Sequence, residues 1–581
     1  MTVERFSPSA LIVADSAELP NDRGIWGTGG WVMPGNREAL DWLTLVRILG
    51  WDAEVVSLPT LEKKINSREW RWIIVACDPE LLDSRLVDLL AYKLAEAPVL
   101  MLLRAGNASL PVSKLTATVA GPETISGRHL KWLGSGGPKS WVCRKPLKAL
   151  RTECERGVES WVTLEDMPLI TAKRIGCGVV ATLAFHPSEA RDESGIATAL
   201  LRHLLIQGSS GPVAWFDFEG VMILRMDDPG GAQNVYSRDW RYCKLNEEAW
   251  RAVGHDLRQR NARLSIGYVS GWVDDADAAR GKLLVGGKTP ARKPGNVYPS
   301  PLVKYWDIAG FSPGDVYDYQ SEYRGIQALR REGLAEVELH GYTHMHPDTK
   351  AWIRAPDRYE NWPATSWYRE LGEAARGTIA SRPPELHPLE LGQAAIQRFF
   401  DTTPSTLIPP GDQWTDESLE RALEVGIQLV SSYYLAILDH GRFCWTQHVC
   451  APYLDSPDQS WFDAGLPVVG YFHDYELACE GVGWMTALLD QWQSDGARWF
   501  IDFREFSNIL SHRVSCSRDG ECHRISVTST TAKKPLLRPI RLGIYLPDSG
   551  RPSRITVLSD GIESEAELDP KSGGFFSASI A

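Results

Sequence analysis

The stretch VMILRMDDPG at residues 221–230 decides how the middle of the chain is expected to fold. Its apolar run is typical of a buried strand, and Pro229 and Gly230 end that strand abruptly. Asp227 and Asp228 therefore stand at a strand's carboxyl end, where the sites of α/β folds form. Two adjacent carboxylates repel each other unless a cation or a proton separates their charges. The same residues also suit a helix cap or a turn, and this stretch alone does not choose between the two interpretations.

Segments with strand and helix patterns alternate from residue 211 to about 510. Such a series predicts an irregular (β/α) barrel, in which the carboxyl ends of the strands meet at one rim. Polar residues follow several of these strands: His340 follows residues 335–339, and His473 follows residues 466–472. Only a barrel or an open sheet brings such distant clusters together with the Asp pair.

His340 and His344 are four residues apart, so one helical turn or one tight loop directs both imidazoles to a single point. Together with Asp228 they form a set of two His and one carboxylate, which leaves coordination positions open for water and substrate. A lone His more often hydrogen-bonds buried groups. The His pair and the Asp pair together favour a divalent metal, and zinc is the expected ion. His346 is a spare candidate that can replace either His.

The order Asp-Asp, His-x-x-x-His, Pro-Pro-Gly and strand-end His resembles the polysaccharide deacetylase superfamily, that is, carbohydrate esterase family 4 and its relatives with the NodB-homology fold. The resemblance covers roughly Trp215 to Leu510. It implies that Asp227 is the catalytic base and His473 the general acid. It also implies that the metal ligands are Asp228, His340 and His344.

The substrate groove is expected around Pro409-Pro410-Gly411, which matches the family's groove motif. Pro410, Gly411 and Trp414 are the residues expected to contact substrate. Trp272, Trp414 and Trp461 follow predicted strand ends, and each is either a platform for a sugar ring or a core side chain. What the resemblance implies as substrate is an N-acetyl group on a sugar or glycoconjugate; the residues themselves indicate only a metal hydrolase.

The chain departs from the family pattern at three places. Gly341 follows the first His, where the family usually has Ser or Thr, and Ile408 replaces the Arg that commonly pairs with the catalytic base. The Asp-x-x-Asp-Trp motif has only a loose echo in residues 455–461. Arg225 offers a replacement for the missing Arg, because it lies two residues before Asp227 and hence on the same face of the strand. Its guanidinium is expected to lower the pKa of the base.

Residues 1–210 alternate between strand and helix patterns, which predicts a doubly wound α/β domain. The region resembles the class I glutamine-amidotransferase-like domain in topology. Cys77 lacks the glycines of a nucleophile elbow, and His186 has no Glu two residues on. A structural or docking role is therefore expected rather than catalysis. Residues 511–581 show short alternating runs separated by turns, which predict a small β-sandwich.

Composition narrows the class of protein. The net charge of −12 argues against a nucleic-acid partner. No segment reaches the roughly 18 apolar residues of a membrane span, and no signal pattern opens the chain, so a cytoplasmic protein is expected. Two alternatives to a sugar deacetylase stay open. One is a C–N hydrolase acting on a non-sugar amide, and the other is a degraded deacetylase domain that binds glycans without cleaving them.

Overall fold

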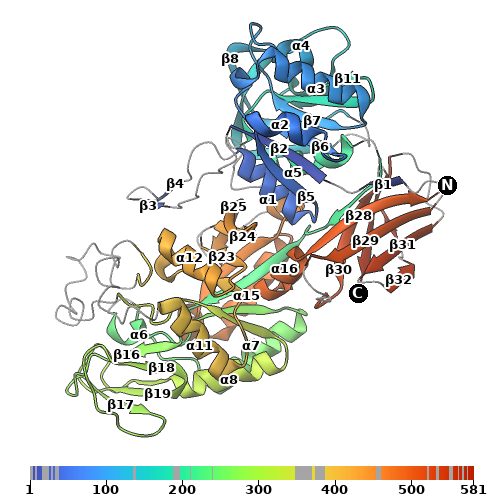
Figure 1. Cartoon of the computed structure of the whole chain (residues 1–581). Helices are drawn as coiled ribbons and strands as arrows, with labels where there is room; N and C mark the ends of the chain where they lie inside the picture. The colour runs from blue at the N-terminus through green and yellow to red at the C-terminus, as the bar shows by residue number, and fades with distance from the viewer. Residues whose placement is uncertain are drawn as a thin grey trace.

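The computed structural model of this chain contains several sheets flanked by helices, which confirms the mixed α/β class (Figure 1). No helix in the described part of the chain is long and apolar enough to cross a membrane. The structure describes residues 4–6, 9–15, 25–27, 30–32, 38–134, 139–187, 196–209, 211–237, 240–346, 369–372, 387–432, 434–452, 459–519, 522–530, 536–547, 554–559, 562–565, 568–571 and 574–580.

The first sheet has a parallel half and an antiparallel half. The parallel half is in the order β5 (Asp52–Ser57), β2 (Ser9–Ala14), β6 (Trp72–Val75), β7 (Leu100–Arg104) and β12 (Gly178–Leu183). Helices α1 (Glu38–Ile48) and α5 (Ile196–Gln207) pack on one face of this half, and α2 (Leu58–Ile65) and α3 (Ser84–Glu96) on the other. The antiparallel half continues from β12 as β11 (Met167–Ile175), β10 (Glu159–Leu164), β8 (Thr118–Trp132) and β9 (Lys139–Cys154).

The central sheet closes on itself around β14 (Val221–Asp227), the strand from the opening stretch. All seven residues of β14 are buried, because parallel strands flank it on both sides. The order from one neighbour of β14 round to the other is β15 (Leu264–Tyr268), β21 (Ala335–Leu339), β22 (Thr406–Leu407), β23 (Leu429–Ser431), β24 (Tyr434–Asp439), β25 (Arg442–Pro452) and β26 (Val468–His473). β27 (Trp499–Ile501) also pairs with β14, along its first residues.

Helices cover the outside of the closed sheet and share its apolar core. They are α7 (Glu247–Gln259), α8 (Tyr319–Arg331), α11 (Pro388–Phe400), α12 (Asp416–Glu424), α14 (Asp474–Glu480) and α15 (Val482–Ser494). Because β14, β15, β21 and β26 run parallel, their carboxyl ends lie at one rim, and this rim carries the acidic and His clusters.

Two features of this region were not predicted. Residues 281–301 contain strands β17 (Gly281–Val285) and β18 (Val297–Pro299), which pair with β19 (Val303–Asp307) and β16 (Gly271–Val273). The hairpin of β24 and β25 is the second feature, and β24 runs antiparallel to both of its neighbours.

The C-terminal strands form two sheets, and each includes a strand from elsewhere in the chain. One sheet contains β28 (His512–Asp519), β29 (Cys522–Ser529), β31 (Arg554–Ser559) and β32 (Ile562–Glu565), with β1 (Glu4–Phe6) at its edge. The other contains β30 (Ile540–Tyr545), β34 (Phe575–Ile580) and β33 (Asp569–Pro570), with β13 (Val213–Phe216) beside β30. Figure 1 shows β1 lying against β28.

Candidate metal centre

Three side chains from two remote segments meet at the rim of the closed sheet. The carboxylate of Asp228 and the imidazoles of His340 and His344 offer ligand atoms that all lie within 4.8 Å of one another. Asp228 Oδ1 is 3.2 Å from His340 Nε2 and 3.3 Å from His344 Nε2. All three side chains are buried. His346 is also buried but does not belong to this group.

The spacing of these donors suits a divalent ion. Tetrahedral zinc with bonds of about 2.0–2.1 Å places its ligand atoms roughly 3.3–3.4 Å apart, close to the separations from Asp228 Oδ1. His340 Nδ1 lies 2.8 Å from the carbonyl oxygen of Ile408, to which it donates in the neutral tautomer. That bond directs the Nε2 lone pair of His340 toward the Asp228 carboxylate. Two electron-rich groups at this distance need a proton or a cation between them.

Left-handed backbone conformations aim the ligands at one point. Asp228 has a φ of 79° and His344 a φ of 56°, values that non-glycine residues adopt mainly where the surrounding structure enforces them. The buried carboxylate of Glu370 accepts hydrogen bonds from the backbone N–H groups of Thr343 and His344, at 3.0 and 3.2 Å. The sequence did not predict Glu370, since nothing near it in the chain marks it as a partner of this loop.

The structure gives a reason for Gly341, one of the departures from the family pattern. Gly341 has a φ of 65°, and a Cβ there would lie 2.5 Å from Glu370 Oε2 and 2.6 Å from Pro410 Cγ. A Ser or Thr does not fit this space without moving the loop. Pro410 thus lies against the loop that carries both His ligands, and Gly411 follows it with a φ of 61°.

The Arg225 hypothesis agrees with the geometry at the adjacent carboxylate. Arg225 Nε donates to Asp227 Oδ1 at 2.9 Å, and Nη2 donates to Oδ2 at 2.5 Å. Arg225 is itself fixed by Ser432, whose carbonyl oxygen accepts from Nη1 at 3.1 Å. Burial raises the pKa of the Asp227 carboxyl, but the charge of Arg225, with that of His340, outweighs burial and lowers the pKa below its usual value. Arg225 therefore supplies the Asp227 carboxylate with the guanidinium partner that Ile408 cannot provide.

His473 faces Asp227 directly across the register of β26 and β14. Its Nδ1 lies 3.3 Å from Glu476 Oε1, and its backbone N–H donates to Glu476 Oε2 at 2.7 Å. Burial lowers the pKa of His473, but the hydrogen bond to Glu476 and the charge of Asp228 outweigh it and raise the pKa to about 9. His473 is consequently protonated at neutral pH.

A fully buried lysine ties the two strand ends together. Lys244 Nζ donates to the carbonyl oxygen of Asp228 at 3.3 Å and forms an ion pair with Asp474 at 2.6 Å. Asp474 follows His473 in the chain, so one ammonium group connects the metal-ligand loop to the residue next to the proposed acid. Glu322, 3.5 Å from the same ammonium, supplies a second carboxylate and accepts from the N–H of Gly230 at 2.8 Å.

Trp240 is a further residue at the centre that sequence inference missed. Its indole N–H donates to Asp228 Oδ2 at 3.1 Å, its ring stacks on Tyr475 at 4.4 Å, and its edge meets the His473 ring at 5.0 Å. The chain has 23 Trp, and no local pattern distinguishes this one.

The three tryptophans expected as possible sugar platforms are core side chains. Trp272 and Trp461 are at most 1% exposed. Trp414 is buried and stacks on Trp445 at 4.8 Å. For Trp272 and Trp461 this burial favours the core interpretation over the sugar platform, and the burial of Trp414 does not support its predicted contact with substrate. The echo of the Asp-x-x-Asp-Trp motif at residues 455–458 lies outside the described residues.

Cys77 in the N-terminal sheet shows no sign of activation. The thiol is buried, and burial raises its pKa to about 12, so it stays protonated at neutral pH. His186 Nε2 lies 3.5 Å from Glu38 Oε2, and Glu38 also pairs with Arg104 at 3.1 Å. These contacts agree with the expectation that the cysteine is not a nucleophile.

Comparisons with known proteins do not assign a family or an activity to the chain. No protein-family model and no curated protein matches the chain. Solved structures that are similar in part include an exo-β-1,4-mannosidase from Opitutaceae bacterium strain TAV5, at 16% identity and a TM-score of 0.21 over 31% of each chain. A pseudoenzyme of carbohydrate esterase family 4 from Bacillus anthracis is 9% identical, with a TM-score of 0.26, over 50% of this chain and 66% of its own. The chain thus spans less than a third of the mannosidase, and similarities this weak assign neither fold nor activity.

Proposed function

We propose that the chain is a metal-dependent hydrolase that removes an N-acetyl group from a sugar or glycoconjugate. The observation that carries the proposal is the joint placement of the Asp228, His340 and His344 cluster beside an Arg225–Asp227 pair and a protonated His473. A metal site alone fits many proteins. A buried base and a cationic acid next to such a site fit a hydrolase.

Asp228, His340 and His344 would hold the ion, with zinc as the ion that this donor set favours. A divalent ion supplies an activated water near neutral pH and polarises the scissile carbonyl. Asp227 is not needed as a ligand, because Arg225 occupies both of its oxygens. The two adjacent carboxylates therefore divide the work between metal binding and proton transfer.

Asp227 takes the proton of the attacking water in this proposal. Its lowered pKa keeps it ionised at neutral pH, so it is ready to accept a proton. His473 gives a proton to the leaving amine, for which it must start protonated, and Glu476 keeps it so. Trp240 contacts the His473 ring edge-on and so restricts the ring's position.

The sugar part of the proposal rests on the order of motifs and the domain division that accompanies it. That division is a (β/α) barrel over residues 211–510 between an amidotransferase-like domain at 1–210 and a β-sandwich at 511–581. Pro410 lies against the loop of the His ligands, as a groove wall at the metal would. The presence of Asp227, His473 and Arg225 argues against a degraded binding protein, because glycan binding alone needs none of them.

Metal analysis combined with acetate release tests the proposal. The purified chain should contain about one equivalent of a divalent metal and release acetate from N-acetylhexosamine conjugates. Asp227→Asn and His473→Asn should each retain the metal and lower kcat by about 10²–10⁴. His340→Ala should lose both metal and activity. His255→Asn, a change at an exposed residue of α7, is the matched control and should alter neither.

The outcomes separate the alternatives. Metal without acetate release from any sugar conjugate, but with hydrolysis of other amides, would replace the sugar by a non-sugar substrate. If the chain contained no metal and hydrolysed no amide, only a binding protein would remain and the proposal would be overturned.

A further inference from the structure

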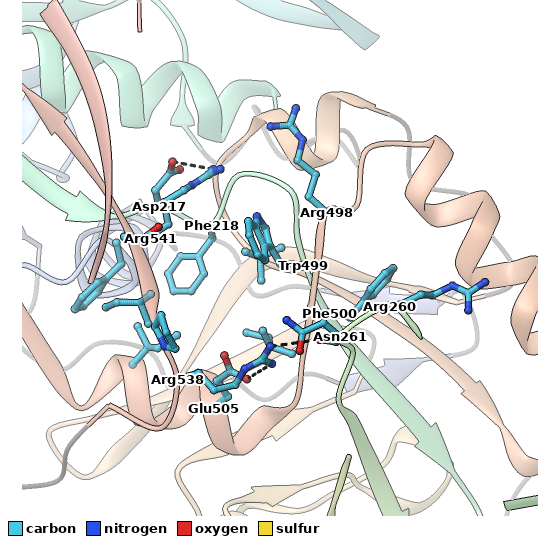
Figure 2. Close-up of a pocket in the computed structure, with 17 residues that line it drawn as sticks. Asp217, Phe218, Arg260, Asn261, Arg498, Trp499, Phe500, Glu505, Arg538 and Arg541 are labelled. Atoms are coloured by element: carbon cyan, nitrogen blue, oxygen red, sulfur yellow. Dashed lines mark hydrogen bonds and ion pairs between the residues drawn. The ribbon is translucent and has the colours of Figure 1, made fainter. Parts of the chain in front are cut away.

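A cavity of about 270 Å³ lies at the end of the closed sheet opposite the metal centre (Figure 2). Its lining includes Val221, the first residue of β14, whereas Asp227 ends the same strand. Six residues of strand separate the two positions by roughly 20 Å. The cavity is therefore a different site from the metal centre, enclosed between β27, helix α16 (Phe503–Leu510) and the C-terminal strands β30 and β34.

An exposed indole is the main feature of this cavity. Trp499 is 49% exposed, although its two neighbours in β27 are buried. Figure 2 shows the rings of Trp499 and Phe218 near the middle of the lining side chains. A large aromatic side chain that is half exposed beside a cavity is typical of a binding surface.

Two charged groups of the cavity wall are held in ion pairs. Arg541 pairs with the buried Asp217 at 2.8 Å, and Arg538 pairs with the buried Glu505 at 3.2 Å. Arg538 also donates to the carbonyl oxygen of Asn261 at 3.3 Å. Each guanidinium is thus held by a carboxylate behind it, and Figure 2 shows the two pairs on different sides of the aromatic rings.

Two more arginines line the cavity, but their guanidinium groups point away from its centre. Figure 2 shows the guanidinium groups of Arg260 and Arg498 extending away from the other lining side chains. Arg260 pairs with Asp256 and Asp490, each at 2.5 Å, and both carboxylates lie outside the lining. Arg498 pairs with Glu219 at 3.7 Å, so each of the four guanidinium groups has a carboxylate partner, which favours a neutral ligand over a phosphate-bearing one.

We propose that this cavity binds a neutral pyranose unit of a glycan, stacked on Trp499. The apolar face of a pyranose ring packs on an indole, while its equatorial hydroxyls reach polar groups at the ring's edge. The exposed side chains of Asn261 and Ser579, together with the edges of the two paired arginines, supply such groups. The volume is below the roughly 300–1,000 Å³ of pockets for drug-sized ligands, which suits a single ring.

This second site does not depend on the proposed hydrolase. Its elements come from the amino ends of the sheet and from the C-terminal strands, and none of its lining residues is a proposed catalytic or metal residue. The site gives the C-terminal strands a function, since β30 and β34 contribute Arg541 and Ser579 to the wall.

Isothermal titration calorimetry on the full chain tests the proposal with three neutral probes: N-acetylchitotriose, cellotriose and mannotriose. The Asp227→Asn background prevents turnover. At least one probe should bind with a Kd of about 1 mM or tighter, and Trp499→Ala should weaken that binding about tenfold or more. Tyr92→Ala, a change at another exposed aromatic residue, is the control and should leave the Kd unchanged.

A second variant guards against a folding artefact. Ser579→Arg adds bulk and an unpaired charge at an exposed position of the cavity wall and should also abolish binding. Binding that survives both variants would place the sugar elsewhere, such as the rim with Asp227, and would overturn the proposal. So would the absence of binding by all three probes, or binding only of uronic acids or sugar phosphates. Acetate release by the chain without the Asp227 change is measured separately, so failure of the hydrolase and failure of this site are distinguishable.

Discussion

Asp227 and Asp228 are neighbours in the chain but have different partners. Asp227 ends the strand and is held by Arg225, whereas the positive φ of Asp228 turns its carboxylate toward His340 and His344. The repulsion expected between the two charges is relieved separately, by a guanidinium on one side and by imidazoles on the other. A change of backbone conformation over one residue thus separates the proposed proton acceptor from the proposed metal ligand.

Arg225→Lys should move the acidic limb of the pH–rate profile. The base works only when ionised, so activity rises with pH through its pKa, and a weaker partner raises that pKa. The limb in kcat/KM should therefore shift to higher pH. Arg225→Ala should shift it further, and loss of one partner of a buried pair should destabilise the fold by about 3–5 kcal/mol. A folded Arg225→Lys variant with an unmoved limb would show that Arg225 does not tune the base.

Glu476→Gln should move the alkaline limb in the opposite direction. His473 donates a proton only below its pKa of about 9, so activity should persist below that pH and fall as pH rises through it. Removing the carboxylate charge 3.3 Å from Nδ1 lowers this pKa, and the limb should shift to lower pH. Gln retains an oxygen for the backbone N–H of His473 and so keeps the helix cap. An alkaline limb that stays in place in this variant contradicts the role of His473 as the acid.

At the scale of elements, Lys244 joins the loop after β14 to the helix that starts after β26. Lys244→Met should lower metal affinity by about 10–100-fold, as loss of outer-shell partners does, and should destabilise the fold because Asp474 and Glu322 lose their shared cation. Metal titration and thermal unfolding measure the two effects. Lys304→Met removes a more exposed ion pair with Asp318 and is the control, with an expected change of about 0–1 kcal/mol. Equal effects of the two variants would show that Lys244 has no special connection to the centre.

Local patterns predicted the elements whose signal is contained in a short stretch. β14 is a mainly apolar run and β21 an alternating one, both followed by polar clusters, and α3 and α8 are amphipathic helices with an Asp cap at the start. The long strands β8 and β9 were not predicted, because many of their side chains are exposed and charged and the pairing partner supplies their order. The sequence did contain a signal for the hairpin of β24 and β25, because Gly441 suits a two-residue hairpin turn. In the structure His440 and Gly441 both have the positive φ that such a turn requires.

The same contrast holds at the candidate site. Asp228, His340 and His344 were found because their spacing has few other uses, and Arg225 because strand geometry places it beside Asp227. Trp240, Lys244 and Glu370 act through contacts with residues far away in the sequence or through loop conformation. A single sequence contains no local pattern that marks such a partner. Their contacts form only in the folded chain, where the closed sheet brings the loops after β14 and β21 together.

For the whole molecule, the pairing of remote strands ties the predicted domains to one another. β13 pairs with β30 along four residues, and Arg47 of α1 pairs with Asp439 of β24 at 2.6 Å. A chain ending at Leu510 loses the partner strands of β1 and β13 and exposes their apolar neighbours to water. It should aggregate or unfold at a lower temperature than the full chain, as measured by size-exclusion chromatography and circular dichroism. A monomeric truncated chain with unchanged Tm would show that residues 511–581 are an independent module.

The most direct test of the central claim is anomalous diffraction from crystals of the zinc-loaded chain, measured on both sides of the zinc absorption edge. We predict one strong peak bonded to the Asp228 carboxylate and to the Nε2 atoms of His340 and His344, at about 2.0–2.2 Å from each, with Asp227 still paired to Arg225. A peak at other residues, or none at all under saturating zinc, would contradict the metal-dependent mechanism.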